Sequence, residues 1–250
     1  MRSIYRTVSG ILRFPARIAR RILPAGALEQ FSFEVRSSIG RRFAKRLAVD
    51  VSKRNYLDLG AADTPKGDFV AVDFFGGSGV YGADLRYPLL IDDACIDGIF
   101  SEHTFEHLSF PEASRLIVEC HRILKPGGRI RIIVPDVSIF AQRYVDRDVA
   151  WFQEWEEHVL HPRGRQMFTM MQAISFVTQE YGHRSAWDFE SLQAVLGAAG
   201  FVDIEKVGYG EGHEPILLRD RNLRSRTIAS VYVEARKPAA RELPANGAIP

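Results

Sequence analysis

The sequence predicts an α/β protein built on a mainly parallel β-sheet, and three observations support this prediction. Short apolar runs typical of buried strands alternate with segments whose apolar residues recur at helical spacing. Several of these segments end at glycine or proline, which interrupt regular structure. The chain has 250 residues, of which 46% are hydrophobic and 26% are charged. The length suits one α/β domain with an appendage, and the composition is typical of a globular protein.

The central part of the chain is expected to supply four strands, at residues 56–60, 68–74, 96–101 and 129–134. A helix is expected to begin at Pro111, because proline is favourable in the first turn. The Lys125–Gly128 turn, Lys-Pro-Gly-Gly, should end it. Strands that alternate with helices predict a parallel sheet with helices on both faces.

Residues 138–187 interrupt this alternation. They contain the three tryptophans and no strand pattern, so we expect a helical insertion over one end of the sheet. This insertion is either a lid that shapes a substrate pocket or a hydrophobic cover. The alternation then resumes with a helix capped by Asp188 or Ser191, followed by strands near residues 202–209 and 229–235.

The N-terminal part of the chain differs in charge from the rest. Residues 1–50 hold 11 Lys/Arg and 3 Asp/Glu, a net charge of +8, whereas the other 200 residues hold 22 and 28, a net charge of −6. We therefore expect a basic helical arm at 1–50, a main domain at 51–238 and a disordered tail at 239–250. The net negative main domain does not favour nucleic acid as a partner.

Residues 1–26 alternate arginines with apolar side chains and admit three interpretations. They fit an amphipathic segment at an anionic membrane surface, an organellar transit peptide, or a helical extension packed on the domain. No run approaches the roughly 20 apolar residues that cross a bilayer. The isolated Cys95 and Cys120 are expected to be reduced thiols. These features favour the cytoplasm, with or without peripheral membrane contact.

The first candidate site is a predicted strand that runs into a glycine turn, Asp58-Leu59-Gly60. A residue without Cβ lets a ligand approach the backbone closely. Asp73 ends the next predicted strand, and a carboxylate there can accept hydrogen bonds from both hydroxyls of a ribose. We expect Gly60 and Asp73 to hold one nucleoside from two sides, at the carboxyl ends of the strands.

These segments, with ADLRYPL, SEHTFEHL and LKPGGRIRIIVPD, resemble the class I S-adenosylmethionine-dependent methyltransferases over roughly residues 55–137. The resemblance resumes at residues 181–201 and 230–238, and looks closest to a bacterial branch found among surface-polysaccharide biosynthesis enzymes. It implies a Rossmann-like fold with seven strands and S-adenosylmethionine as the cofactor. It also implies methyl transfer to an oxygen or nitrogen of a small-molecule or glycan acceptor.

The resemblance further implies roles for individual residues. The methionine part of the cofactor would lie against Asp58, Gly60 and the backbone of Ala61. The ribose would bind Asp73, the adenine would meet Asp84 and Leu85, and the sulfonium would lie beside Ser101. The sequence departs from the family at Ala62, where glycine is common, and at residues 63–67, which leave room for one turn at most.

The second candidate site is the segment Ser101–His107, in which His103, Glu106 and His107 would share one face of a helix. The pattern H-x-x-E-H is also the zinc signature of a class of metallopeptidases, but there it lies on a long isolated helix. In a second interpretation, the resemblance implies a divalent ion, because some family members bind one through E-x-x-E-H. A further ligand would come from His158, His161 or His183.

In our preferred interpretation, His103 is a general base or orients the acceptor. His107 and His183 would then lie on the acceptor side of the site. None of these residues need be catalytic, and the alternative function is a methyltransferase-like protein that binds a ligand or partner without catalysis, attached peripherally to a membrane. The acceptor and the oligomeric state stay open at this point.

Overall fold

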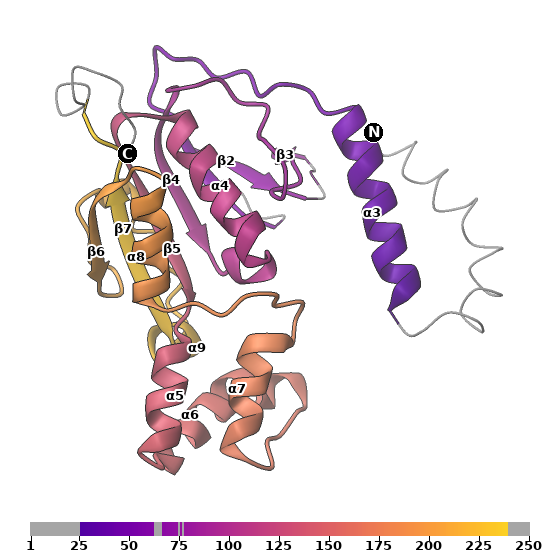
Figure 1. Ribbon diagram of the computed structural model, residues 1–250, viewed down its shortest axis with the longest axis vertical. Helices are drawn as coiled ribbons and strands as arrows, with labels where there is room; N and C mark the ends of the chain where they lie inside the picture. Colours follow the sequence, from indigo (N-terminus) through magenta and orange to yellow (C-terminus); the bar gives the residue numbers. More distant parts are fainter. Residues whose placement is uncertain (1–25, 63–66, 75, 77, 240–250) are drawn as a thin grey trace. The chain divides into compact units, whose positions relative to one another are not determined.

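The structure is a computed structural model that describes residues 26–62, 67–74, 76 and 78–239 (Figure 1). The chain divides into two compact units, Met1–Ala44 and Lys45–Pro250. The first unit contains the helix α3 (Ala27–Arg42), which has an acidic residue in its first turn and two arginines in its last, as the helix dipole favours. The interpretations of residues 1–25 and of the tail from 240 concern residues outside this description.

The second unit contains one seven-stranded sheet, whose strands are β1 (Tyr56–Leu59), β2 (Phe69–Asp73), β3 (Val80–Gly82), β4 (Ile96–Glu102), β5 (Leu124–Pro135), β6 (Val202–Val207) and β7 (Ser230–Arg236). Their order is β3-β2-β1-β4-β5-β7-β6. The strand β7 runs antiparallel to both of its neighbours, and the other strand pairs are parallel. The predicted Rossmann-like, mainly parallel sheet of seven strands is therefore confirmed.

The Lys-Pro-Gly-Gly turn lies inside a strand rather than before it. The helix α4 (Phe110–Ile123) ends as predicted, and β5 begins at once with Leu124. Ile96 pairs with Leu124 but Gly98 pairs with Arg129, so the turn forms an irregularity at the start of β5. Gly127 has a φ of +81°, which only glycine adopts without strain.

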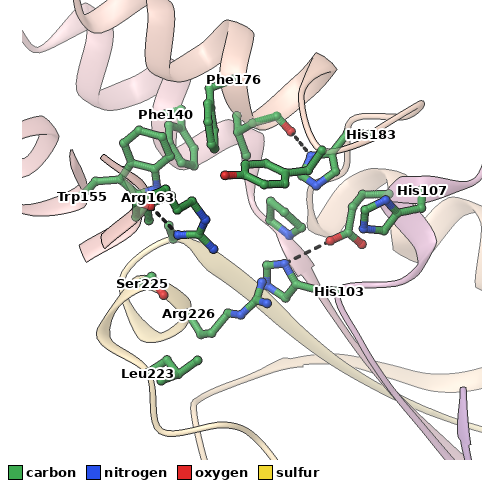
Figure 2. Close-up of a pocket in the computed structure, with 16 residues that line it drawn as sticks. His103, His107, Phe140, Trp155, Arg163, Phe176, His183, Leu223, Ser225 and Arg226 are labelled. Carbon is green, nitrogen blue, oxygen red and sulfur yellow. Dashed lines mark hydrogen bonds and ion pairs between the residues drawn. The ribbon is translucent and has the colours of Figure 1, made fainter. Parts of the chain in front are cut away.

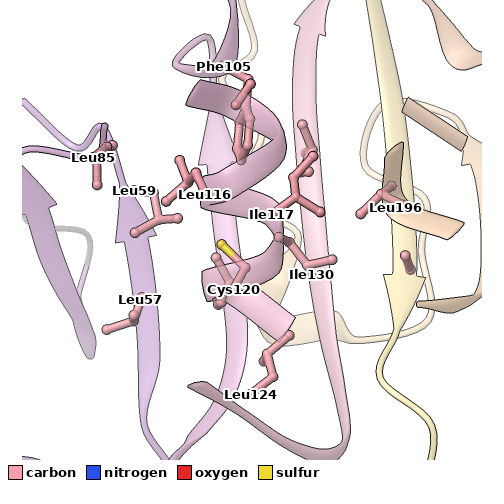
Figure 3. Close-up of a cluster of buried hydrophobic side chains, with 14 of the residues drawn as sticks. Leu57, Leu59, Leu85, Phe105, Leu116, Ile117, Cys120, Leu124, Ile130 and Leu196 are labelled. Carbon is pink, nitrogen blue, oxygen red and sulfur yellow. The ribbon is translucent and has the colours of Figure 1, made fainter. Parts of the chain in front are cut away.

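Alternate residues of the strands pack into two clusters on opposite faces of the sheet. On one face, α4 and α8 (Phe189–Ala198) cover the main core, which Figure 3 shows. On the other face, Phe100, Ile133 and Tyr232 pack with Leu217 of the 3₁₀ turn η3 (Pro215–Leu217). Cys95 and Cys120 are free and buried, as expected, and burial raises the pKa of both thiols.

Residues 137–179 form three helices beyond one end of the strands: α5 (Val137–Val145), α6 (Val149–Val159) and α7 (Met170–Gln179) (Figure 1). These helices share an aromatic core of their own with Phe140, Trp155 and Phe176. Trp187 instead belongs to the main core and stacks on Phe110, with ring centroids 4.4 Å apart. Asp188, rather than Ser191, is the N-cap of α8.

A buried charge network joins the sheet to the loop after β6. Arg131 is fully buried; its Nε donates to Asp220 at 2.7 Å and its Nη1 to Glu234 at 3.0 Å. The backbone nitrogen of His213 also donates to Glu234, so the polar cluster at residues 211–215 covers this network.

Within the described residues, no helix is long and apolar enough to cross a membrane.

Candidate functional site

The carboxyl ends of β1, β2 and β4 meet at the point where the strand order reverses. The chain runs outward from β1 to β2 and β3, and then returns to β4 on the other side of β1. Ligands of open parallel sheets bind in the crevice at such a switch point. Gly60 follows β1, Asp73 ends β2 and Ser101 lies near the end of β4, so these three residues lie at this edge.

The turn after β1 contacts the end of β2 directly. Gly60 has a φ of +77°, and its backbone nitrogen donates to the carbonyl of Val72 at 2.9 Å. Two residues later, the backbone nitrogen of Ala62 donates to Oδ2 of Asp73 at 3.0 Å. Gly60 and Asp73 therefore lie side by side.

Gly60 is also required by a side chain from the segment that follows β4. A Cβ at this position would overlap the side chain of Thr104. The hydroxyls of Thr104 and Ser101 donate to the carbonyl of Leu59 at 3.0 and 3.1 Å, which ties β4 to the end of β1. Ser101 and Asp58 are both buried. The absence of a Cβ at Gly60 is thus explained by packing as well as by any ligand.

The pair Asp84-Leu85 is already engaged within the protein. The guanidinium of Arg86 donates to both carboxylate oxygens of Asp84, with Nη2 at 2.7 Å from Oδ2. Leu85 packs into the main core. An adenine at this position would share Asp84 with Arg86.

His103 follows β4 and holds two polar partners at once. Its Nδ1 lies 3.0 Å from Oε1 of Glu106, and its Nε2 lies 3.0 Å from the hydroxyl of Ser230 at the start of β7. A carboxylate can only accept, so Nδ1 carries the proton and Nε2 accepts from the Ser230 hydroxyl. His103 has a φ of +54°, which is strained for a residue with a Cβ.

Burial governs the protonation of this pair. Desolvation lowers the pKa of His103, against the attraction of Glu106, so the imidazole is neutral near neutral pH. Burial opposes ionisation of Glu106, but the neighbouring His103 and His107 hold the pKa of this carboxyl below its usual value. A neutral imidazole beside a carboxylate is the arrangement that a general base requires.

The segment after α7 brings His183 next to His107, although the two residues are 76 positions apart in the sequence. The backbone nitrogens of Arg184 and Ser185 donate to the carbonyl of Glu106, at 2.7 and 3.2 Å. The rings of His107 and His183 then meet edge to face, with centroids 4.9 Å apart. Ligand atoms of Glu106, His107 and His183 all lie within 4.8 Å of one another, so these residues can hold a metal ion.

The metal candidates are therefore not those expected from H-x-x-E-H alone. Both ring nitrogens of His103 have protein partners, so His103 does not join this cluster. Nδ1 of His183 lies 2.6 Å from the carbonyl of Val177 and must donate to it, which leaves Nε2 with a lone pair. Neither His158 nor His161 joins the cluster in the described part of the chain.

A cavity of about 290 Å³ lies between the end of the sheet and the helices α5, α6 and α7. Figure 2 shows that His103, His107 and His183 border it on one side, with Trp155 and Phe176 on the other. Thr104 contacts Gly60, and the preceding His103 lines the cavity, so two adjacent residues connect the glycine turn to the cavity.

Sequence reasoning missed three groups at this site: Ser230, Arg163 and Arg226. Arg226 belongs to the short helix α9 (Arg224–Thr227), whose residues show no motif. Ser230 opens β7 and lies in the strand predicted at residues 229–235, and its position there was the one available signal.

Comparison with known proteins gives a partial match to one family. A model described as "Methyltransferase domain" matches residues 35–132, less than half of the chain. No curated protein matches the chain.

Several solved structures are similar to this chain at low identity. A S-adenosylmethionine-dependent methyltransferase from Archaeoglobus fulgidus is 16% identical, with a TM-score of 0.42, over 82% of this chain and 94% of that one. Phosphoethanolamine N-methyltransferase 2 from Haemonchus contortus, solved with S-adenosyl-L-methionine, is 13% identical, with a TM-score of 0.43, over 87% of this chain and 54% of that one. The chain spans about half of the methyltransferase SibL, at 14% identity, 76% coverage of this chain, 52% of that one and a TM-score of 0.41.

Proposed function

We propose that this chain is a S-adenosylmethionine-dependent methyltransferase that acts on an oxygen, or a nitrogen, of an acceptor bound in the cavity beside His103. The observation that carries the proposal is the contact between the Gly60 turn and Asp73 at the switch point of the sheet. Thr104 connects this turn to His103, which lines the cavity. The family match over residues 35–132 includes both residues.

The proposed cofactor fits the residues at this edge. Asp73 would accept hydrogen bonds from ribose hydroxyls, and the Gly60–Ala61 backbone would lie along the methionine part. Asp58 and Ser101 are buried near the carboxyl ends of β1 and β4, at the same edge of the sheet. We propose that Asp84 and Leu85 border the adenine. When bound, the cofactor supplies a methyl group that its sulfonium already makes reactive.

The chain's own contribution is alignment and removal of a proton. Alignment of two reactants can lower a barrier by about 7–11 kcal/mol. An acceptor hydroxyl must also lose its proton as its oxygen bonds to the methyl carbon. We assign that proton to Nε2 of His103, which would give up its hydrogen bond from the Ser230 hydroxyl to accept it. The carboxylate of Glu106 beside Nδ1 would stabilise the resulting imidazolium.

Calorimetry with S-adenosylhomocysteine tests the proposal. We expect the wild-type chain to bind it and Asp73→Asn to bind it at least tenfold more weakly, because hydrogen bonds to a charged group contribute about 1.5–3 kcal/mol. Asp92→Asn, at an exposed position away from this edge, is the matched control. Wild-type protein that does not bind would refute the proposal. Binding without transfer of labelled methyl to any acceptor in a broad panel would instead favour the non-catalytic alternative.

A metal-assisted form of the same reaction is a second candidate, supported by the cluster of Glu106, His107 and His183. One carboxylate and two imidazoles suit Zn²⁺ or a similar first-row ion, and three protein ligands leave a position for a substrate oxygen. The bond from Nδ1 of His183 to Val177 is the outer-shell support that metal-binding histidines usually have.

Metal analysis tests this second candidate without an activity assay. Purified protein should retain about one equivalent of metal after dialysis, and Co²⁺ should give a d–d absorption band. His183→Ala should abolish both, whereas His158→Ala, on α6 and outside the cluster, should change neither. No retained metal and no Co²⁺ band in the wild type would remove this candidate and leave the base mechanism standing.

A further inference from the structure

Two arginines line the cavity, and neither has a carboxylate hydrogen-bond partner in the part of the chain that the structure describes. Arg226 and Arg163 both face it, and Figure 2 shows them among the lining residues. Among the described residues, no side-chain hydrogen bond or ion pair is made by Arg226. The guanidinium of Arg163 donates to the carbonyl of Val159 and lies over the ring of Tyr181, 5.2 Å from its centroid.

The two carboxylates whose charges act on Arg226, those of Glu102 and Glu106, also face other residues. Glu102 faces Arg221, whose Nε lies 3.4 Å from Oε2 and whose backbone nitrogen donates to Oε1 at 3.2 Å. Glu106 faces His103. Two guanidinium groups, those of Arg163 and Arg226, and one carboxylate, that of Glu106, line the cavity. The cavity therefore carries a net positive charge.

Arg226 is partly buried, and a partly buried guanidinium gains stability when an anion joins it. Its planar set of donors matches the oxygens of a carboxylate or a phosphate in a bidentate arrangement. A small anion bound in the cavity would thus complete a contact that the protein itself leaves open at Arg226.

The opposite wall of the cavity is apolar. Phe140, Trp155 and Phe176 line it, with Val159 and Val177 beside them. A volume of about 290 Å³ is at the small end of the range for ligand pockets, about 300–1,000 Å³. The space suits one ring or a short apolar group rather than a polymer.

We propose that the acceptor is a small molecule with an anionic group, carboxylate or phosphate, held by Arg226, and an aromatic or apolar body against Trp155 and Phe176. This proposal rests on the proposed function where it identifies the bound molecule as the methyl acceptor. The anion site itself does not depend on methyl transfer. His103 lines the same cavity, so a hydroxyl on such a ligand lies within reach of the proposed base.

Binding of matched probes tests the proposal. Benzoate, phenyl phosphate and neutral benzyl alcohol share one ring and differ in charge. Titration calorimetry at millimolar concentration, with S-adenosylhomocysteine present, should show at least one anion binding at least tenfold more tightly than benzyl alcohol. The anion that binds more tightly distinguishes carboxylate from phosphate recognition.

Variants then assign the effect to Arg226. Arg226→Gln should reduce the affinity for that anion to the level of benzyl alcohol, whereas Arg143→Gln, an exposed arginine on α5 paired with Asp148, should not change it. Circular dichroism checks that both variants fold. No preference for either anion, or a preference that survives Arg226→Gln, overturns the proposal. A different outcome is that wild-type protein fails to bind S-adenosylhomocysteine and still shows an anion preference that Arg226→Gln removes. That outcome would refute the proposed methyltransferase function and leave the anion site standing.

Discussion

Nε2 of His103 lies 3.0 Å from the hydroxyl of Ser230, although the two residues are 127 positions apart. His103 follows β4 and Ser230 opens β7, and β5 lies between these strands in the sheet. The contact fixes the imidazole between Ser230 and Glu106, and it directs the lone pair of Nε2 toward a hydroxyl. Orientation by two partners is what separates a positioned base from a surface histidine.

The first prediction concerns this contact. His103→Gln should lower kcat by about 10²–10⁴-fold for a hydroxyl acceptor, because the proton acceptor is lost. Ser230→Ala should lower kcat less, since Nε2 remains but is no longer oriented. Single-turnover rates with labelled cofactor measure both, and S-adenosylhomocysteine affinity should stay unchanged. Equal rates for His103→Gln and wild type would show that His103 is not the base.

The second prediction separates two reasons for a glycine after β1. Gly60→Ala combines a left-handed φ of +77° with overlap on Thr104, whereas Gly67→Ala has a φ of +58° and no neighbour within 4 Å among the residues that the structure describes. The left-handed conformation costs about 1–2 kcal/mol per residue, and overpacking adds about 1–3 kcal/mol. Urea unfolding should therefore show a greater loss for Gly60→Ala. Equal losses would mean that Thr104 moves aside without cost.

The third prediction concerns the buried charge of Arg131. Arg131→Met leaves Asp220 and Glu234 buried without their guanidinium. Removal of one partner from a buried ion network costs about 3–5 kcal/mol. Denaturant unfolding should show this loss, and Arg143→Met, at an exposed pair, should change the free energy of unfolding by no more than about 1 kcal/mol. A loss below about 1 kcal/mol for Arg131→Met would contradict the network's role.

The fourth prediction is a pH dependence of stability at His121. Burial, and then the charge of Lys237, lower the pKa of this histidine, whose ring packs on Phe201. Below the ordinary histidine pKa of about 6.5, the unfolded chain binds the proton more readily than the folded chain. The free energy of unfolding should therefore decrease as the pH falls from 7 through the folded pKa.

Two variants check this dependence. His121→Asn removes the titrating group, and Lys237→Gln removes the charge that opposes protonation, so both should reduce the slope of stability against pH below about 6.5. Thermal unfolding over that range measures the slope. An unchanged slope in both variants would assign it to other groups.

The sequence alone determined the strands and the glycine turn, because these are local. Strands such as Tyr56–Leu59 and Ile96–Glu102 bury nearly every residue, and the resulting apolar runs are visible without a structure. Gly60 and Asp73 were expected to meet, because the ends of adjacent parallel strands lie at one edge. The strand β3 has only three residues, so no apolar run marked it.

The tertiary structure alone decided which distant side chains form the cavity. Ser230 reaches His103 because β7 inserts antiparallel beside β5, and His183 reaches His107 because the segment after α7 bonds to the backbone of Glu106. Arg226 lies on a four-residue helix with no pattern of its own. Periodicity reports which face of an element is buried, but contacts between residues far apart depend on the connections of the chain, and local patterns do not encode those.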